Sequence, residues 1–122
     1  MAVGGAVVLA LAMATSGHAS GTVAQTTFLT FSGAVALPGT ELPAGTYIFE
    51  LAEPMSDPTV VRVLSRDRQK VYLTAFTMMV ERPEGQRRDQ HVTLGEARRG
   101  VPPAVTAWYP IDDAMGRQFI YR

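Results

Sequence analysis

A chain of 122 residues has room for one domain with one core, and its 47% hydrophobic content with zero net charge excludes a highly charged, disordered chain. The same neutrality argues against nucleic acid as a partner, because binding to a polyanion depends on a surplus of Lys and Arg. The absence of cysteine excludes disulfide bonds and thiolate metal sites, so packing alone has to supply the stability.

The N-terminal part of the chain has the pattern of a secretory signal. Residues 3–14 form an uncharged apolar run, and small and polar residues follow it over 15–20. We therefore expect residues 1–24 to be a signal-peptide-like export segment, with cleavage between Ser20 and Gln25. The apolar run is too short for a membrane span, which needs about 20 residues. The expected location is secreted or periplasmic, with no stable membrane span.

Residues 25–122 are predicted to form one β domain. Short β-branched and aromatic runs alternate with Gly, Pro and Asp turns, and no helical periodicity of ordinary length occurs. Six to eight such strands predict a small antiparallel β-sandwich. The expected strands cover residues 26–31, 35–37, 46–51, 59–64, 71–80, 91–94, 104–109 and 118–121.

The alternation of side chains along these strands predicts the core. In residues 46–51, for example, Tyr47, Phe49 and Leu51 share one face. The run 71–80 is apolar on both faces, which indicates a central strand covered on both sides or one that carries a partner surface. The residues expected inside are Tyr47, Phe49, Leu51, Val61, Val63, Leu73, Phe76 and Trp108.

Several motifs follow one another in a distinctive order. LPAGTY occupies 42–47, VPPA at 101–104 follows Val92, and Trp108 precedes GRQFIY at 116–121. With the signal-like segment, this order resembles a family of small exported bacterial β-sandwich proteins of unknown function. The resemblance implies export and a β-sandwich fold. It implies no catalytic residue, because the motifs consist of turn and core elements.

The chain shows no catalytic motif. His91 is the only histidine after residue 24, and no Gly-x-Ser-x-Gly elbow accompanies it. One histidine without cysteine cannot supply the three or four nitrogen or sulfur ligands of a zinc site. Asp112 and Asp113 are the only adjacent carboxylates, and we predict that they form a turn rather than a calcium site. No catalytic residue, metal or cofactor is expected.

Aromatic residues provide the candidate ligand-binding site. The candidate ligand-binding residues are Trp108, Tyr109 and His91. A sugar ring could stack on the aromatic rings if they were exposed, namely those of Tyr47, Tyr72, Trp108, Tyr109 and Tyr121. The alternative interpretation, favoured by the general burial of aromatic bulk, places these rings in the core.

The sequence predicts an exported, non-catalytic binding or assembly domain that acts in the periplasm or outside the cell on an unknown protein, glycan or envelope partner. One alternative is a small periplasmic hydrolase with a site built from scattered Asp and Glu residues and His91. Another is a structural subunit that self-associates by β-strand addition. The stretch from Thr26 to Leu37 would serve there, because it lacks the charge and proline that normally protect a sheet edge.

Overall fold

The computed structural model describes residues 26–87 and 89–122, so the predicted export segment lies outside the described residues. Within the described ranges the protein is all-β, without helices. The strands are β1 (Thr26–Phe31), β2 (Val35–Leu37), β3 (Thr40–Leu42), β4 (Gly45–Glu53), β5 (Asp57–Ser65), β6 (Val71–Glu81), β7 (Val92–Leu94), β8 (Val105–Trp108) and β9 (Met115–Phe119).

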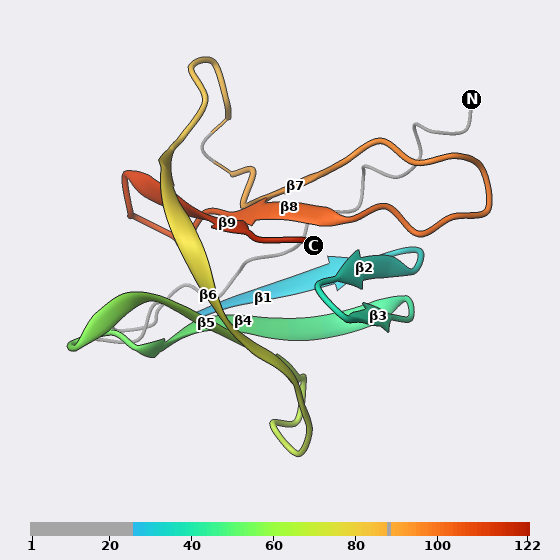
Figure 1. The fold of residues 1–122 in the computed structure, drawn as a ribbon, viewed down its shortest axis with the longest axis horizontal. Helices are drawn as coiled ribbons and strands as arrows, with labels where there is room; N and C mark the ends of the chain where they lie inside the picture. The colour runs from blue at the N-terminus through green and yellow to red at the C-terminus, as the bar shows by residue number, and fades with distance from the viewer. Residues whose placement is uncertain (1–25, 88) are drawn as a thin grey trace.

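Seven of these strands form one antiparallel sheet in the order β1-β4-β5-β6-β9-β8-β7, and β2 and β3 form a separate hairpin (Figure 1). The predicted fold class, a small antiparallel β protein, is confirmed. The strands β4, β5 and β6 are consecutive in the chain and pair as hairpins, whereas β6 next pairs with β9 rather than with β7.

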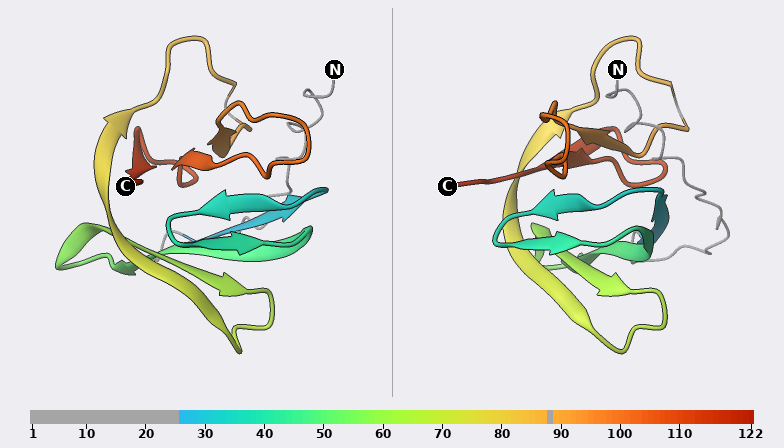
Figure 2. Two further views of the ribbon diagram at one scale, coloured as in Figure 1. Left: turned by 45° about the vertical axis from the view of Figure 1, so that its right-hand side comes forward. Right: turned by 90° about the vertical axis from the view of Figure 1, so that its right-hand side faces the viewer.

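The long strand β6 carries the sheet from one layer to the other. Its first half, from Val71 to Phe76, pairs with β5, and its second half, from Thr77 to Glu81, pairs with β9. A strand that changes partners in this way makes a corner between two packed layers. Figures 1 and 2 show the result: β1, β4 and β5 lie on one side, β7, β8 and β9 lie on the other, and β6 bends between them. The curled sheet is a small sandwich or half-barrel.

The core fills the space between the two layers. Phe49 of β4 lies at its centre, with ring centroids 6.1 Å from Trp108 and 6.3 Å from Phe119 of the opposite layer. The β2–β3 hairpin adds Val35, Leu37 and Leu42 to the same cluster. Six of the residues predicted inside are buried: Tyr47, Phe49, Leu51, Val61, Val63 and Trp108.

The prediction that Phe76 is buried is wrong, because its side chain is 67% exposed. On β6, Leu73 and Thr77 face the core, and Leu73 is only partly buried. Phe76 has the opposite parity and points to the convex side of the corner. Because residues 71–80 are apolar on both faces, the sequence pattern did not reveal which face would be covered.

The last strand also differs from its prediction. It begins at Met115 instead of residue 118, so Gly116 lies inside a strand, where glycine is normally unfavourable. The reason is Tyr109, whose ring lies directly on the glycine. A Cβ atom at position 116 would lie 2.3 Å from Cδ1 of that ring. The short strand β3, from Thr40 to Leu42, was not predicted at all.

Candidate functional site

The three predicted ligand-binding residues are all buried. Trp108 and Tyr109 are consecutive, so their rings point to opposite sides of the sheet. Trp108 packs against Phe49 in the core, and Tyr109 lies on the other side. His91 is next to Tyr109, whose backbone N–H donates a hydrogen bond of 2.7 Å to the His91 carbonyl. The structure thus brings His91 and Tyr109 together but does not place the three side chains on one accessible surface.

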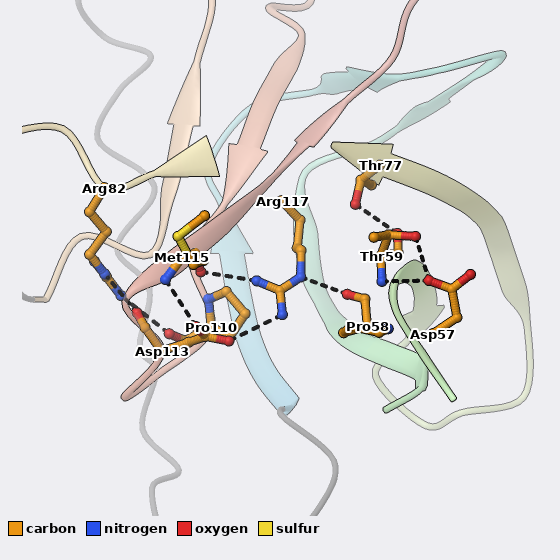
Figure 3. Close-up of polar contacts among 9 residues, drawn as sticks. All are labelled: Asp57, Pro58, Thr59, Thr77, Arg82, Pro110, Asp113, Met115 and Arg117. Carbon is orange, nitrogen blue, oxygen red and sulfur yellow. Dashed lines mark hydrogen bonds and ion pairs between the residues drawn. The ribbon is translucent and has the colours of Figure 1, made fainter. Parts of the chain in front are cut away.

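The guanidinium of Arg82 stacks on the ring of Tyr109. The guanidinium carbon lies 5.3 Å from the centroid of the tyrosine ring, within the range of a cation–π contact. The same guanidinium donates hydrogen bonds to the carbonyls of Asp113 (3.1 Å), Pro110 (3.2 Å) and Gln90 (3.4 Å). Figure 3 shows its bonds to the 110–113 turn. Arg82 therefore ties that turn to the segment that leads into β7.

The imidazole of His91 lies in an unfavourable environment for a positive charge. Burial lowers its pKa and the charge of Arg82 lowers it further, whereas a hydrogen bond between the imidazole and the Tyr109 backbone and the charge of Asp89 act in the opposite direction. Its Nδ1 atom is buried and has no hydrogen-bond partner among the described residues. A catalytic histidine needs an orienting partner and access to substrate. The burial of His91 keeps a substrate from its ring.

Arg117 is a buried polar centre that the sequence did not indicate. Only 2% of it is exposed, and its guanidinium donates to the carbonyls of Pro58 (2.8 Å) and Met115 (3.0 Å) and to Oδ2 of Asp113 (3.1 Å). A buried charge is costly unless it is paired and hydrogen-bonded. The carboxylate and two carbonyls satisfy the guanidinium, which assigns Arg117 a structural role.

Side chains also provide hydrogen-bond partners for backbone groups at the start of β5, where β6 no longer pairs with it. The carbonyl of Thr59 accepts a 2.7 Å bond from Oγ1 of Thr77, and the backbone N–H of Thr59 donates to Oδ1 of Asp57 at 3.0 Å. Figure 3 shows these contacts beside the bond from Arg117 to Pro58. Buried backbone groups require partners. Arg117 and Thr77 therefore donate hydrogen bonds to the carbonyls of Pro58 and Thr59, which have no backbone partner on β6 because that strand bends away.

Asp112 and Asp113 form the predicted turn. Asp112 has a φ of 64°, a left-handed conformation that Asp tolerates in turns. Oδ1 of Asp113 accepts a 2.9 Å bond from the Met115 N–H, and its Oδ2 pairs with Arg117. Both carboxylate oxygens of Asp113 thus serve the fold. Within residues 26–87 and 89–122, no group of three or more His, Cys, Asp or Glu side chains is placed to hold a metal ion.

The exposed apolar side chains mark a different surface. Phe76 (67% exposed), Met78 (55%) and Ile120 (45%) lie on the convex side of the corner, and we call these three residues the outer patch. The register Thr77↔Phe119 places Phe76 and Ile120 beside one another on the same face. The doubly apolar pattern of residues 71–80 indicates a partner surface on this strand, although the predicted core includes Phe76.

In the part of the chain that the structure describes, no helix is long and apolar enough to cross a membrane. No family model, curated protein or solved structure matches this chain. The resemblance to small exported bacterial β-sandwich proteins therefore remains a prediction.

Proposed function

We propose that this protein is an exported, non-catalytic binding domain that acts in the periplasm or outside the cell, with the outer patch as its contact surface. The observation that supports the proposal is the exposure of Phe76 and Met78 on β6 and of Ile120 directly after the adjacent β9, at the convex corner. Single exposed apolar residues are normal on protein surfaces, whereas contiguous ones mark interaction sites.

The chemistry of the outer patch favours a protein as the partner. Phe76 supplies a flat apolar ring, and Met78 is a flexible, polarizable side chain that adapts to irregular apolar surfaces. Sugar recognition combines ring stacking with polar groups, and the rings best suited to it, Trp108 and Tyr109, are buried. We therefore favour an apolar protein surface in the cell envelope over a glycan.

The periplasmic hydrolase is less well supported. It would have used His91, which is buried, has no partner at Nδ1 among the described residues, and lies in an environment that lowers its pKa. The carboxylate whose charge acts on His91, Asp89, is paired with Arg87.

Site-specific photo-crosslinking in an exporting bacterium tests the proposal. A photoreactive phenylalanine analogue replaces Phe76, and the matched control replaces Met55, which is 88% exposed but lies outside the outer patch. We expect a discrete crosslinked species from position 76 that is absent from position 55 and that disappears when Ile120→Ser is added. Equal labelling from both positions, or none from position 76, would contradict the proposal.

Strand addition is a second candidate function, because β1 lies at an edge of the seven-stranded sheet. Its backbone pairs with β4 over its whole length, so the N-terminal strand belongs to its own domain. An edge strand can nevertheless accept another strand on its other side.

A further inference from the structure

The first half of β6 has a strand on only one side. The stretch 71–75 pairs with β5, whereas β9 pairs with β6 only from Thr77 to Glu81. No other described strand or loop forms a backbone hydrogen bond with residues 71–75. Figures 1 and 2 show this half of β6 at the lower margin of the molecule. We call residues 71–75 the open edge.

The C-terminal residues leave β6 because they are held elsewhere. Phe119 is the last residue of β9 that pairs with β6. The hydroxyl of Tyr121 donates a hydrogen bond of 2.6 Å to the carbonyl of Val105, and the carbonyl of Ala36 lies 3.2 Å from the same hydroxyl. These contacts direct the chain toward β8 and β2, so β9 does not continue along the open edge.

The open edge lacks the features that normally prevent pairing with another chain. Its sequence, VYLTA, contains no charge and no proline, and its β-branched and aromatic residues favour an extended strand. A row of unpaired backbone groups recruits an extended segment, because each free N–H and C=O then gains a partner. The open edge therefore favours a strand as its ligand over a helix or a small molecule.

A basic turn at residues 66–70 lies at one end of the open edge, and the outer patch lies at the other. The turn contains one acid and three cations: Asp67, Arg66, Arg68 and Lys70. Arg68 pairs with Glu50, whereas Arg66 and Lys70 are exposed and have no carboxylate partner among the described residues. Lys70 lies along the edge, with its ammonium nitrogen 4.8 Å from the centroid of the Tyr72 ring. These two charges complement an acidic side chain.

We infer, on the basis of the proposed function, that the protein partner of the outer patch contributes an extended segment that adds to the open edge as a strand. Every pairing in the sheet is antiparallel, so this strand runs in the direction of β9. It passes the outer patch first and reaches the basic turn at its C-terminal end. Its chemistry is an uncharged, apolar stretch of about five residues followed by Asp or Glu beside Arg66 and Lys70.

The test uses the partner segment that becomes attached to the photoreactive analogue at position 76, identified by mass spectrometry. A synthetic peptide of that sequence is the probe, together with two versions N-methylated at alternate residues. Successive N–H groups of a strand point to opposite edges, so only one version loses the donors that face β6. Calorimetric titration of the exported protein should show that version binding about tenfold or more weakly than the parent, and the other binding like the parent.

The outcomes separate this inference from the proposed function. Equal affinities of the two methylated peptides would overturn strand addition and leave the contact with the outer patch intact. No crosslink from position 76 would remove both.

Charge reversal tests the acidic end of the segment. The double variant Arg66→Glu with Lys70→Glu should weaken binding of the parent peptide by about tenfold or more, because attraction becomes repulsion. The matched control, Arg98→Glu with Arg99→Glu, makes the same charge change in the exposed loop between β7 and β8 and should bind like the wild type. Thermal melting checks that both variants are folded. Equal affinities of the two folded variants would contradict the assigned chemistry.

Discussion

At the scale of single residues, the aromatic rings have two distinct roles. Phe49 is buried and faces rings from both layers, with centroids 6.1–6.3 Å from those of Phe31, Trp108 and Phe119. Phe76, of the same residue type and on a strand of the same sheet, is mostly exposed. The same substitution at the two positions should therefore have different consequences.

We expect Phe49→Ala to lower the free energy of unfolding by about 3–5 kcal/mol, because it leaves a cavity between the layers. Phe76→Ala should change that free energy by about 0.5 kcal/mol or less, as is usual for a surface position. Urea denaturation of both purified variants measures the difference. Equal losses for the two would show that the placement of β6 is wrong.

The contrast between these two phenylalanines also shows what the sequence can predict. Alternation placed Tyr47, Phe49 and Leu51 together in the core correctly, although Ile48 and Glu50 on the other face of the same strand are also buried. It could not place Phe76, because β6 is apolar on both faces and the bend decides which face is covered. Such a bend depends on pairing with β9, far along the chain, and local periodicity does not contain that information.

At the scale of elements, the errors in strand boundaries have the same origin. Glycine at 116 argued against a strand there, yet β9 includes it because the ring of Tyr109 occupies the space of a side chain. The buried contacts of Arg117 were equally invisible, since its partner Pro58 is 59 residues away in the sequence. In the candidate site, the burial of Trp108 and Tyr109 was the favoured interpretation, because aromatic bulk is generally buried. The burial of His91 was not predicted, because it depends on how β7, β8 and β9 pack.

The segment that leads into β7 should respond to pH through His91. Burial lowers the folded-state pKa of His91 below its unfolded value of about 6.5. The unfolded state then binds more protons over the interval between these two pKa values, so stability rises with pH. This contribution is complete above about pH 6.5 and is lost as the pH falls toward the folded-state pKa. We expect the free energy of unfolding to fall between pH 7.5 and pH 5.5.

The variant His91→Gln removes the titrating group and should show a smaller fall over the same interval. Urea denaturation at the two pH values compares it with the wild type. Carboxylates contribute little in this window, because their usual pKa values lie near 4. An identical pH dependence in both proteins would show that His91 is not the group responsible.

At the scale of the whole molecule, the export prediction separates the chain into a leader and a β domain. The apolar run 3–14 and the small residues after it predict a mature N terminus between Ser20 and Gln25. N-terminal sequencing of protein recovered from the periplasm or medium of an exporting host measures this directly. Recovery of exported protein that still begins at Met1 would contradict the prediction.

The pairing of β6 with β9 has a consequence for the order in which the chain folds. Short turns connect β4, β5 and β6, so their hairpins can close quickly. The corner is complete only when β9 arrives, after the 33 residues from Arg82 to Ala114 have been closed into a loop. Loop-closure entropy precedes the gain from such distant contacts, and topologies rich in them fold in about milliseconds to seconds. Until then, the side of Phe49 that faces Trp108 and Phe119 is uncovered, so docking of β9 and β8 is the expected slow step.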